Sequence, residues 1–262
     1  MAKRLFLLAF LLIGLSACMT PGIRRVTQQG ELVVGTAADM PPLNMTTKDG
    51  KIIGYEIDIA RLMASAMGVR LRLVPMPFPE LLPALEARKV DMVISGMTIT
   101  PERNLKFAFV GPYFISGKSF LTKKATIAQT KDARKLNQTG TKLAALEGST
   151  SQSFVQEFMP KATLVTIKTY DEGVNMVLED KVEALIADFP ICIVSVFRYP
   201  NRGLASLITP VTYEPLGIAL PADDPHMVNW VENFLRTLEG GGGLKALQDR
   251  WFKKPTWLHQ LP

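Results

Sequence analysis

The sequence predicts α/β lobes with mostly parallel sheets. Three observations carry this prediction. Short runs rich in β-branched residues alternate with segments whose apolar residues recur at helical spacing, and this order occurs in both halves of the chain. A polar stretch at 123–142 separates the halves. In each half an apolar strand runs into a loop of small residues, which is where open α/β sheets bind ligands.

The individual elements follow from the period of the apolar residues. Alternating or continuous apolar runs predict strands at 31–37, 69–76, 90–97, 143–148, 163–170 and 182–188. Amphipathic spacing predicts helices at 54–68, 78–89 and 171–181. Strand and helix therefore succeed one another as in a doubly repeated βαβα unit.

The N-terminus has the pattern of a bacterial secretion signal. It begins with basic residues, continues with an apolar run at 5–15 and ends with small residues. The run is shorter than the roughly 20 apolar residues that span a bilayer. Its end, 15–18, resembles a lipobox, in which Cys18 is lipidated; the alternative is ordinary cleavage. We expect 1–18 to be a signal peptide with a lipobox, 19–29 to be a linker, and the protein to be anchored to a membrane of the cell envelope.

The composition argues against several classes of protein. The 30 Lys and Arg residues exceed the 24 Asp and Glu residues by only a scattered +6, so nucleic acid is not an expected partner. His226 and His259 do not combine with Cys or carboxylates at metal-ligand spacing, so no metal or cofactor is expected. After Cys18 only Cys192 remains, and its apolar surroundings indicate a buried, inert thiol without a disulfide.

The stretch SGMTITPERN (95–104) joins an apolar strand to the start of a helix. Thr100 is the predicted N-cap and Pro101 the first helical residue. A capping box would place Glu or Gln where this chain has Arg103. A cation in the first helical turn opposes the helix dipole. The spacing alone leaves open a solvated arginine, a structural ion pair or an anion-binding residue.

Several motifs, in order from about residue 30 to 252, resemble family 3 solute-binding proteins, the amino-acid receptors of ABC importers. They are GYEIDIA, PALEARKVDMVISGMTITPERN, FVGPYFISG, LEGSTSQSF, KVEALIADFP and LKALQDRWF. The resemblance implies the type II periplasmic binding protein fold, with mixed, mostly parallel sheets and two hinge strands. It places lobe 1 at 30–114 plus 215–262 and lobe 2 at 115–214. We expect a periplasmic monomer that closes over an amino acid and delivers it to the permease of an ABC transporter.

The resemblance also assigns the ligand's α-carboxylate to Arg103, whose guanidinium matches the two carboxylate oxygens. Gly96 and Thr98 fall on positions that offer a backbone carbonyl, an N–H and a hydroxyl. From the opposite lobe, Ser149 and Thr150 stand at a predicted helix start, which favours an anion; simple N-capping is the alternative.

Asp188 ends the strand predicted at 182–188 and is assigned to the ligand's α-ammonium. Its alternative role is to cap the following helix. A zwitterion would then bridge two residues on different lobes, so that lobe closure is favoured only when both ends of the ligand are bound.

The side-chain pocket is expected to be apolar, with Phe78 and Met40 as walls. Apolar residues stand at three positions where relatives with polar ligands carry polar partners: Ala37, Leu146 and Ala187. An unpaired polar head group would cost about 1–3 kcal/mol there. We therefore expect an apolar or aromatic amino acid, although Asp39 and Glu147 are nearby carboxylates that would serve a polar or basic ligand.

Two other functions share this fold. A periplasmic cyclohexadienyl dehydratase uses a cleft carboxylate as general acid, a part that Glu147 or Asp188 would take if burial raised its pKa. A ligand-sensing receptor would differ only in its partner. Nothing in the sequence selects either function, and we expect no enzymatic activity.

Overall fold

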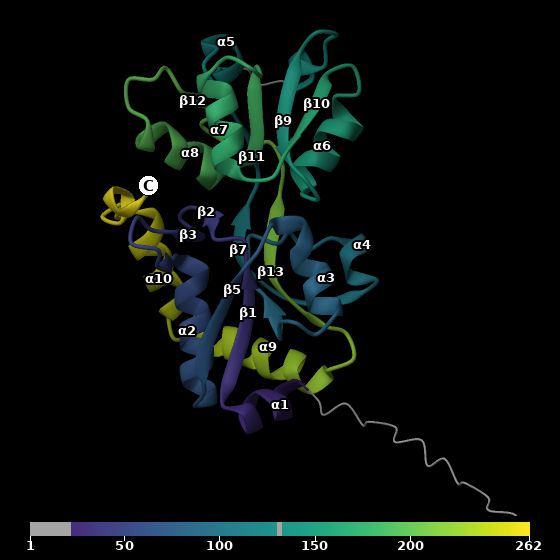
Figure 1. Ribbon diagram of the computed structural model, residues 1–262, viewed down its shortest axis with the longest axis vertical. Coiled ribbons are helices and arrows are strands. Elements are labelled where there is room, and N and C mark those ends of the chain that lie inside the picture. The colour runs from purple at the N-terminus through teal and green to yellow at the C-terminus, as the bar shows by residue number, and fades with distance from the viewer. Residues whose placement is uncertain (1–21, 130–132) are drawn as a thin grey trace, which may run out of the picture.

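The computed structural model describes residues 22–129 and 133–262 and divides them into two lobes, each built on a five-stranded sheet (Figure 1). The first sheet has the order β5 (Arg70–Pro75), β1 (Glu31–Thr36), β6 (Met92–Val93), β13 (Glu214–Pro221), β7 (Phe107–Ser116). The second has the order β10 (Thr163–Ile167), β9 (Lys142–Leu146), β11 (Ala184–Asp188), β8 (Lys118–Thr122), β12 (Ala205–Ser206). A small third sheet joins β2 (Asp39–Met40), β3 (Asn44–Thr46) and β4 (Ile52–Ile53).

The sheets are mixed in the same way in both lobes. Strand β1 is parallel to β5 and β6, whereas β13 is antiparallel to β6 and β7. In the second lobe β9 is parallel to β10 and β11, whereas β8 is antiparallel to β11 and β12. The predicted α/β class with mixed sheets is confirmed. The sheets are not mostly parallel, because each five-stranded sheet has two parallel and two antiparallel pairings.

The chain crosses between the lobes at two adjacent places. It enters the second lobe between β7 and β8 and returns before β13, where Glu214 pairs with Ser116 in the antiparallel ladder. Gly117 lies at this crossing. A Cβ there would be 2.2 Å from the carbonyl oxygen of Thr212, so only glycine lets the two connections lie this close.

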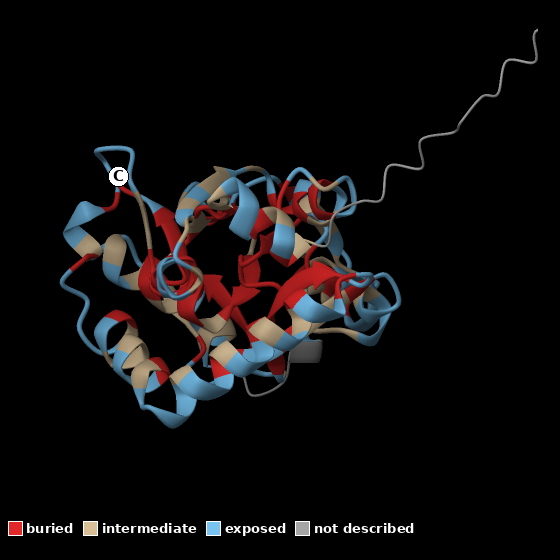
Figure 2. Ribbon diagram, turned by 90° about the horizontal axis from the view of Figure 1, so that it is seen from below, coloured by how far each residue is buried: buried red, intermediate tan, exposed pale blue. Residues whose placement is uncertain are grey.

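Helices cover the sheets. In the first lobe they are α1 (Gly22–Gln29), α2 (Tyr55–Met67), α3 (Leu81–Glu86), α4 (Pro101–Asn104), α9 (Pro225–Gly240) and α10 (Gly243–Phe252). In the second lobe they are α5 (Ala125–Ala128), α6 (Thr150–Phe158), α7 (Tyr170–Leu178) and α8 (Phe189–Arg198). Figure 2 shows buried residues gathered in the interior of the lobes and exposed residues on the outer faces of these helices. Short 3₁₀ helices occur at Phe78–Glu80, Ala133–Leu136 and Leu258–Gln260.

Two sequence predictions differ from the structure for clear physical reasons. The expected linker at 19–29 is helical from Gly22, because Ile23 and Val26 lie nearly one turn apart and are both buried. The expected strand at 90–97 keeps ladder pairing only at Met92–Val93, and its remainder becomes the loop that carries Gly96. The signal run and Cys18 lie outside the described residues. Among residues 22–129 and 133–262, no helix has both the length and the apolar character to cross a membrane.

Candidate functional site: the cleft between the lobes

Arg103 reaches from the first lobe to the second. Its backbone N–H is capped by Thr100 Oγ1 at 3.2 Å, as the sequence predicts for the start of α4. Its Nη1 donates to the carbonyl of Thr98 at 2.8 Å, and its Nη2 donates to the carbonyl of Gly148 in the second lobe at 3.2 Å. The guanidinium carbon lies 6.0 Å from the centre of the Phe78 ring.

The charge of Arg103 is held in a partly desolvated place. Burial lowers the pKa of the guanidinium, while the negative charges of Glu214 and Asp188 act in the opposite direction. An arginine side chain has five N–H donors, so the two carbonyl contacts leave donors for an anion. The cation in the first turn of α4 is therefore placed in the interlobe cleft, where a carboxylate would pair with it.

The buried carboxylate of Glu56 holds the loop before α4 in place. Gly96 has φ +57°, and its N–H donates to Glu56 Oε1 at 2.7 Å. Glu56 also accepts a hydrogen bond from Asn44 Nδ2 at 2.6 Å and one from the Tyr113 hydroxyl. Burial raises the pKa of Glu56. A Cβ at Gly96 would lie 2.4 Å from Met40 Cε, so the methionine side chain occupies the space that glycine leaves.

The second lobe contributes the start of α6. Ser149 caps this helix by accepting from Gln152 N at 3.3 Å, and its own hydroxyl donates to the Leu146 carbonyl at 2.7 Å. The hydroxyl of Thr150 lies 3.3 Å from that of Thr98 in the first lobe and donates to Glu214 Oε2 at 3.1 Å. The structure thus brings the predicted Thr98, Arg103, Ser149 and Thr150 to one interlobe site.

Asp188 lies at the end of β11 with a partner that the sequence analysis did not identify. Lys118 Nζ is 3.0 Å from Asp188 Oδ1 and 3.5 Å from Glu214 Oε2. Ser116 Oγ donates to the same Asp188 oxygen at 3.4 Å. The side chain of Lys118 is 1% exposed and that of Asp188 is 4% exposed. The signal that could have revealed the lysine is its place at the start of KSFLT, where a cation directly precedes small and apolar residues of a strand.

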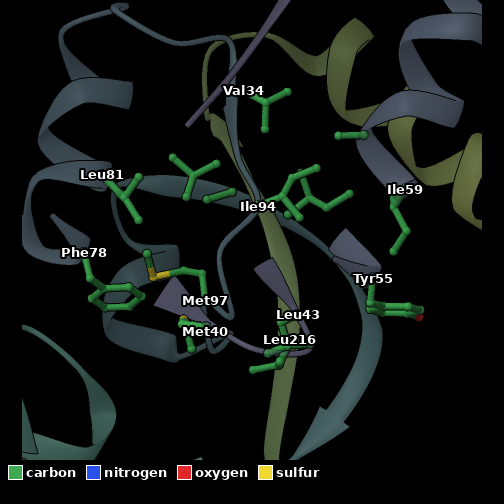
Figure 3. Close-up of a cluster of buried hydrophobic side chains, with 14 of the residues drawn as sticks. Val34, Met40, Leu43, Tyr55, Ile59, Phe78, Leu81, Ile94, Met97 and Leu216 are labelled. Carbon is green, nitrogen blue, oxygen red and sulfur yellow. The ribbon is translucent and has the colours of Figure 1, made fainter. Parts of the chain in front are cut away.

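The predicted apolar walls lie together. Met40 and Phe78 are both buried and belong to one cluster with Met97, and Figure 3 shows these three side chains gathered at one end of it. Leu146 and Ala187 have no exposed surface, whereas Ala37 is half-buried. Two of the three positions on which the apolar expectation rests are therefore covered by protein atoms in this arrangement of the lobes.

Asp39 forms a further link between the lobes. Its Oδ2 accepts from the backbone N–H of Tyr170, the first residue of α7, at 3.2 Å. Its Oδ1 is buried without a hydrogen-bond donor. Burial raises the pKa of Asp39 to about 6, and the neighbouring Asp171 adds to the increase. Glu147, the other carboxylate noted in the sequence, is exposed.

A cavity of about 550 Å³ adjoins this site on the side of α3, α4 and α6. Arg103, Ser149 and Thr150 line it together with Glu86, Lys106 and Gln152. Within the two described segments, no group of His, Cys, Asp and Glu is placed to hold a metal ion. Cys192 is buried, and this burial raises the pKa of its thiol to about 12, as expected for an inert cysteine.

The pattern of this chain matches a known family over most of its length. The family model of bacterial extracellular solute-binding proteins, family 3, matches residues 32–254. The chain belongs to this family. The resemblance inferred from the sequence motifs is therefore confirmed.

Individual members of the solute-binding family show how close the similarity is. The L-cystine-binding protein TcyJ of Escherichia coli K12 is 27% identical over 233 residues, 88% of this chain and 85% of that protein. A binding component of an ABC transporter from Wolinella succinogenes, solved with lysine, is 38% identical with a TM-score of 0.82 and covers 88% of this chain and 99% of its own. The ancestral amino acid-binding protein AncCDT-1, a precursor of cyclohexadienyl dehydratase, is 34% identical with a TM-score of 0.82 over 89% of this chain and 100% of its own.

Proposed function

We propose that this solute-binding protein is an extracytoplasmic receptor that closes over a free amino acid and delivers it to an ABC importer. The observation that carries the proposal is the contact of Arg103 with Gly148, and of Thr98 with Thr150, across the two lobes. A guanidinium and two hydroxyls from both sides of a hinge offer charge and donors to one carboxylate. Asp188 would accept the α-ammonium at the other end.

Which amino acids bind depends on the residues that contact the ligand's side chain. Met40 and Phe78 form a buried apolar cluster beside Arg103, which supports the apolar or aromatic ligand expected from the sequence. A basic amino acid is the second candidate, because Asp39 Oδ1 is buried without a donor and solved relatives carry lysine or arginine. A ligand ammonium or guanidinium would supply that donor.

The test is a thermal-shift screen of all the common amino acids, followed by calorimetry and competition among the best ligands. Saturating binding of one amino acid supports the receptor function. If leucine or phenylalanine binds more tightly than lysine or arginine, the apolar walls decide the preference; the reverse order assigns it to Asp39. Absence of binding by every amino acid would contradict the proposal.

The dehydratase alternative receives no support from the two carboxyl groups considered for it. Glu147 is exposed, and Asp188 accepts from Lys118 rather than standing alone in an apolar pocket. A carboxyl group that acts as a general acid needs a raised pKa, which burial favours and a cationic neighbour opposes. Incubation of the purified protein with prephenate should therefore yield no phenylpyruvate.

The proposal also includes the export of the protein and its anchoring to a membrane. We infer export from the apolar run at 5–15 and lipidation at Cys18 from the lipobox-like end of that run. Helix α1 then begins only a few residues after the anchor, so the first lobe would stand close to the membrane. The receptor would act as a monomer beside its permease.

A further inference from the structure

Lys118 is an unusual residue to find buried beside the crossing between the lobes. It begins β8 directly after the crossing at Gly117, and its side chain is 1% exposed. Its ammonium lies between Asp188 Oδ1, at 3.0 Å, and Glu214 Oε2, at 3.5 Å. A buried ion pair costs desolvation on both sides and commonly adds little net stability over apolar packing. The lysine therefore calls for an explanation other than stability.

The position of this ammonium coincides with a role already assigned to the ligand. In the proposed function Asp188 accepts the α-ammonium, and the lysine ammonium has the same charge and the same three donors as that group. Ser116 Oγ also donates to the oxygen that Lys118 uses. The protein itself thus supplies the cation that Asp188 would otherwise take from an amino acid.

A second ammonium beside Asp188 would lie away from water next to the like charge of Lys118. The other carboxylate at the site, Glu214, is already engaged by Lys118 and by the Thr150 hydroxyl. Like charges in a buried site repel strongly, because the surrounding dielectric is low. A ligand with a hydroxyl or a carbonyl oxygen at the α-carbon avoids this repulsion. Such a group can also accept a hydrogen bond from the ammonium of Lys118, which an α-ammonium cannot do.

We propose that Lys118 replaces the α-ammonium, so that the cleft takes 2-hydroxy or 2-oxo carboxylates at least as readily as the α-amino acids of the same side chain. This inference rests on the carboxylate site of the proposed function, with Arg103 as its counter-charge. It adds a class of ligand in which the α-substituent is neutral. Lys118 is then a specificity-determining residue that acts through Asp188.

The experiment compares matched ligand pairs on the unmodified protein by calorimetry. Suitable pairs are phenylalanine with 3-phenyllactate, leucine with 2-hydroxyisocaproate, and lysine with 6-amino-2-hydroxyhexanoate. We expect the hydroxy acid of the best pair to bind as tightly as the amino acid or more tightly. A preference for the amino acid by more than about tenfold overturns the inference and leaves the receptor function standing.

A variant identifies the residue responsible. Lys118→Gln keeps a donor toward Asp188 but removes the charge, so its preference should shift toward the amino acid by about tenfold or more. Lys123→Gln is the matched control, because this lysine is only partly buried and pairs with Asp180 away from the cleft. If a folded Lys118→Gln protein has the same ratio of hydroxy-acid affinity to amino-acid affinity as the unmodified protein, the assignment is overturned. If the variant does not fold, the affinity ratio of the unmodified protein decides.

The remaining outcomes separate the two proposals. Binding of hydroxy acids without binding of amino acids supports the role of Lys118 and contradicts an amino-acid receptor. Binding of neither class, in the unmodified protein and in Lys118→Gln, overturns both proposals.

Discussion

Arg103 Nη2 donates a hydrogen bond to the carbonyl oxygen of Gly148 at 3.2 Å, which joins the first lobe to the second. The same guanidinium donates to Thr98 in its own lobe at 2.8 Å. One side chain therefore contacts both walls of the cleft and retains donors for an anion. A ligand carboxylate at this place would add its binding energy to a contact that already favours closure.

The first prediction follows from this placement. Arg103→Ala should abolish measurable binding of the amino acid found in the ligand screen, a loss of about 2–5 kcal/mol, because a buried carboxylate loses its counter-charge. Arg103→Lys should also bind weakly, since an ammonium cannot make the bidentate contact. Calorimetry measures both losses.

The control for this prediction is Arg202→Ala, which removes an exposed arginine of the second lobe. Its affinity should equal that of the unmodified protein. Near-normal affinity in an Arg103→Ala protein with an unchanged unfolding temperature would exclude Arg103 from the carboxylate site.

Much of the fold was predictable because it depends on local pattern. The alternation of strands and helices and the cap at Thr100 are set by residues close together in the chain, and both predictions are confirmed. Helix α1 was missed because its short apolar pair, Ile23 and Val26, becomes informative only once the surface that it packs against is known.

The contents of the cleft were less predictable because they depend on distant partners. Lys118 and Asp188 are 70 residues apart, and Asp39 and Tyr170 are 131 apart. No spacing rule in the sequence connects such pairs. The family resemblance supplied Arg103 and Asp188 as candidates, but it could not indicate that Asp188 already has a cationic partner in this chain.

The second prediction concerns that buried pair. Asp188→Asn should lower the free energy of unfolding by about 3–5 kcal/mol, because it leaves the ammonium of Lys118 with only Glu214 nearby, at 3.5 Å. Lys118→Gln combined with Asp188→Asn should recover part of the loss, since the amide pair itself is uncharged and only Glu214 then lacks its cationic partner. Denaturant unfolding without ligand gives the coupling energy between the two residues. Additive effects of the two substitutions would show that the pair is not coupled.

The third prediction tests the glycine beside Met40. Gly96→Ala should destabilise the protein and weaken ligand binding, because Gly96 has φ +57° and a Cβ would lie 2.4 Å from Met40 Cε. Backbone strain alone costs about 1–2 kcal/mol. Gly50→Ala is a matched control: it has φ +77° but no atom within 4 Å of the added Cβ. If both variants lose the same stability, the methionine contact has no effect beyond strain.

The fourth prediction concerns processing at the N-terminus. Mass spectrometry of the mature protein from a bacterial envelope should find Cys18 as a lipid-modified first residue. Cys18→Ser should then appear as soluble or unprocessed protein, because the lipid attachment point is lost. An unmodified mature N-terminus would contradict the lipobox interpretation, while leaving the ligand site untouched.

The fifth prediction is that the affinity for an apolar ligand such as leucine or phenylalanine rises as the pH falls from 7 toward 4. Burial between the lobes raises the pKa of Asp39 from 3.8 to about 6, although the N–H of Tyr170 acts in the opposite direction. A carboxyl whose pKa is higher in the closed state takes up a proton on closure, so closure is fully favoured below about 4 and loses this contribution as the pH rises through about 6. A shift of this size corresponds to a factor on the order of 100.

Asp39→Asn separates this effect from every other titrating group. The amide has no proton to gain, so the slope of log affinity against pH between 4 and 6 should flatten, and the affinity at pH 7 should approach the low-pH affinity of the unmodified protein. Asp180→Asn is the control, because this residue is largely exposed and pairs with Lys123 on the surface of the second lobe. If Asp39→Asn retains the full pH dependence, the titrating group lies elsewhere, and the link between Asp39 and Tyr170 does not control closure.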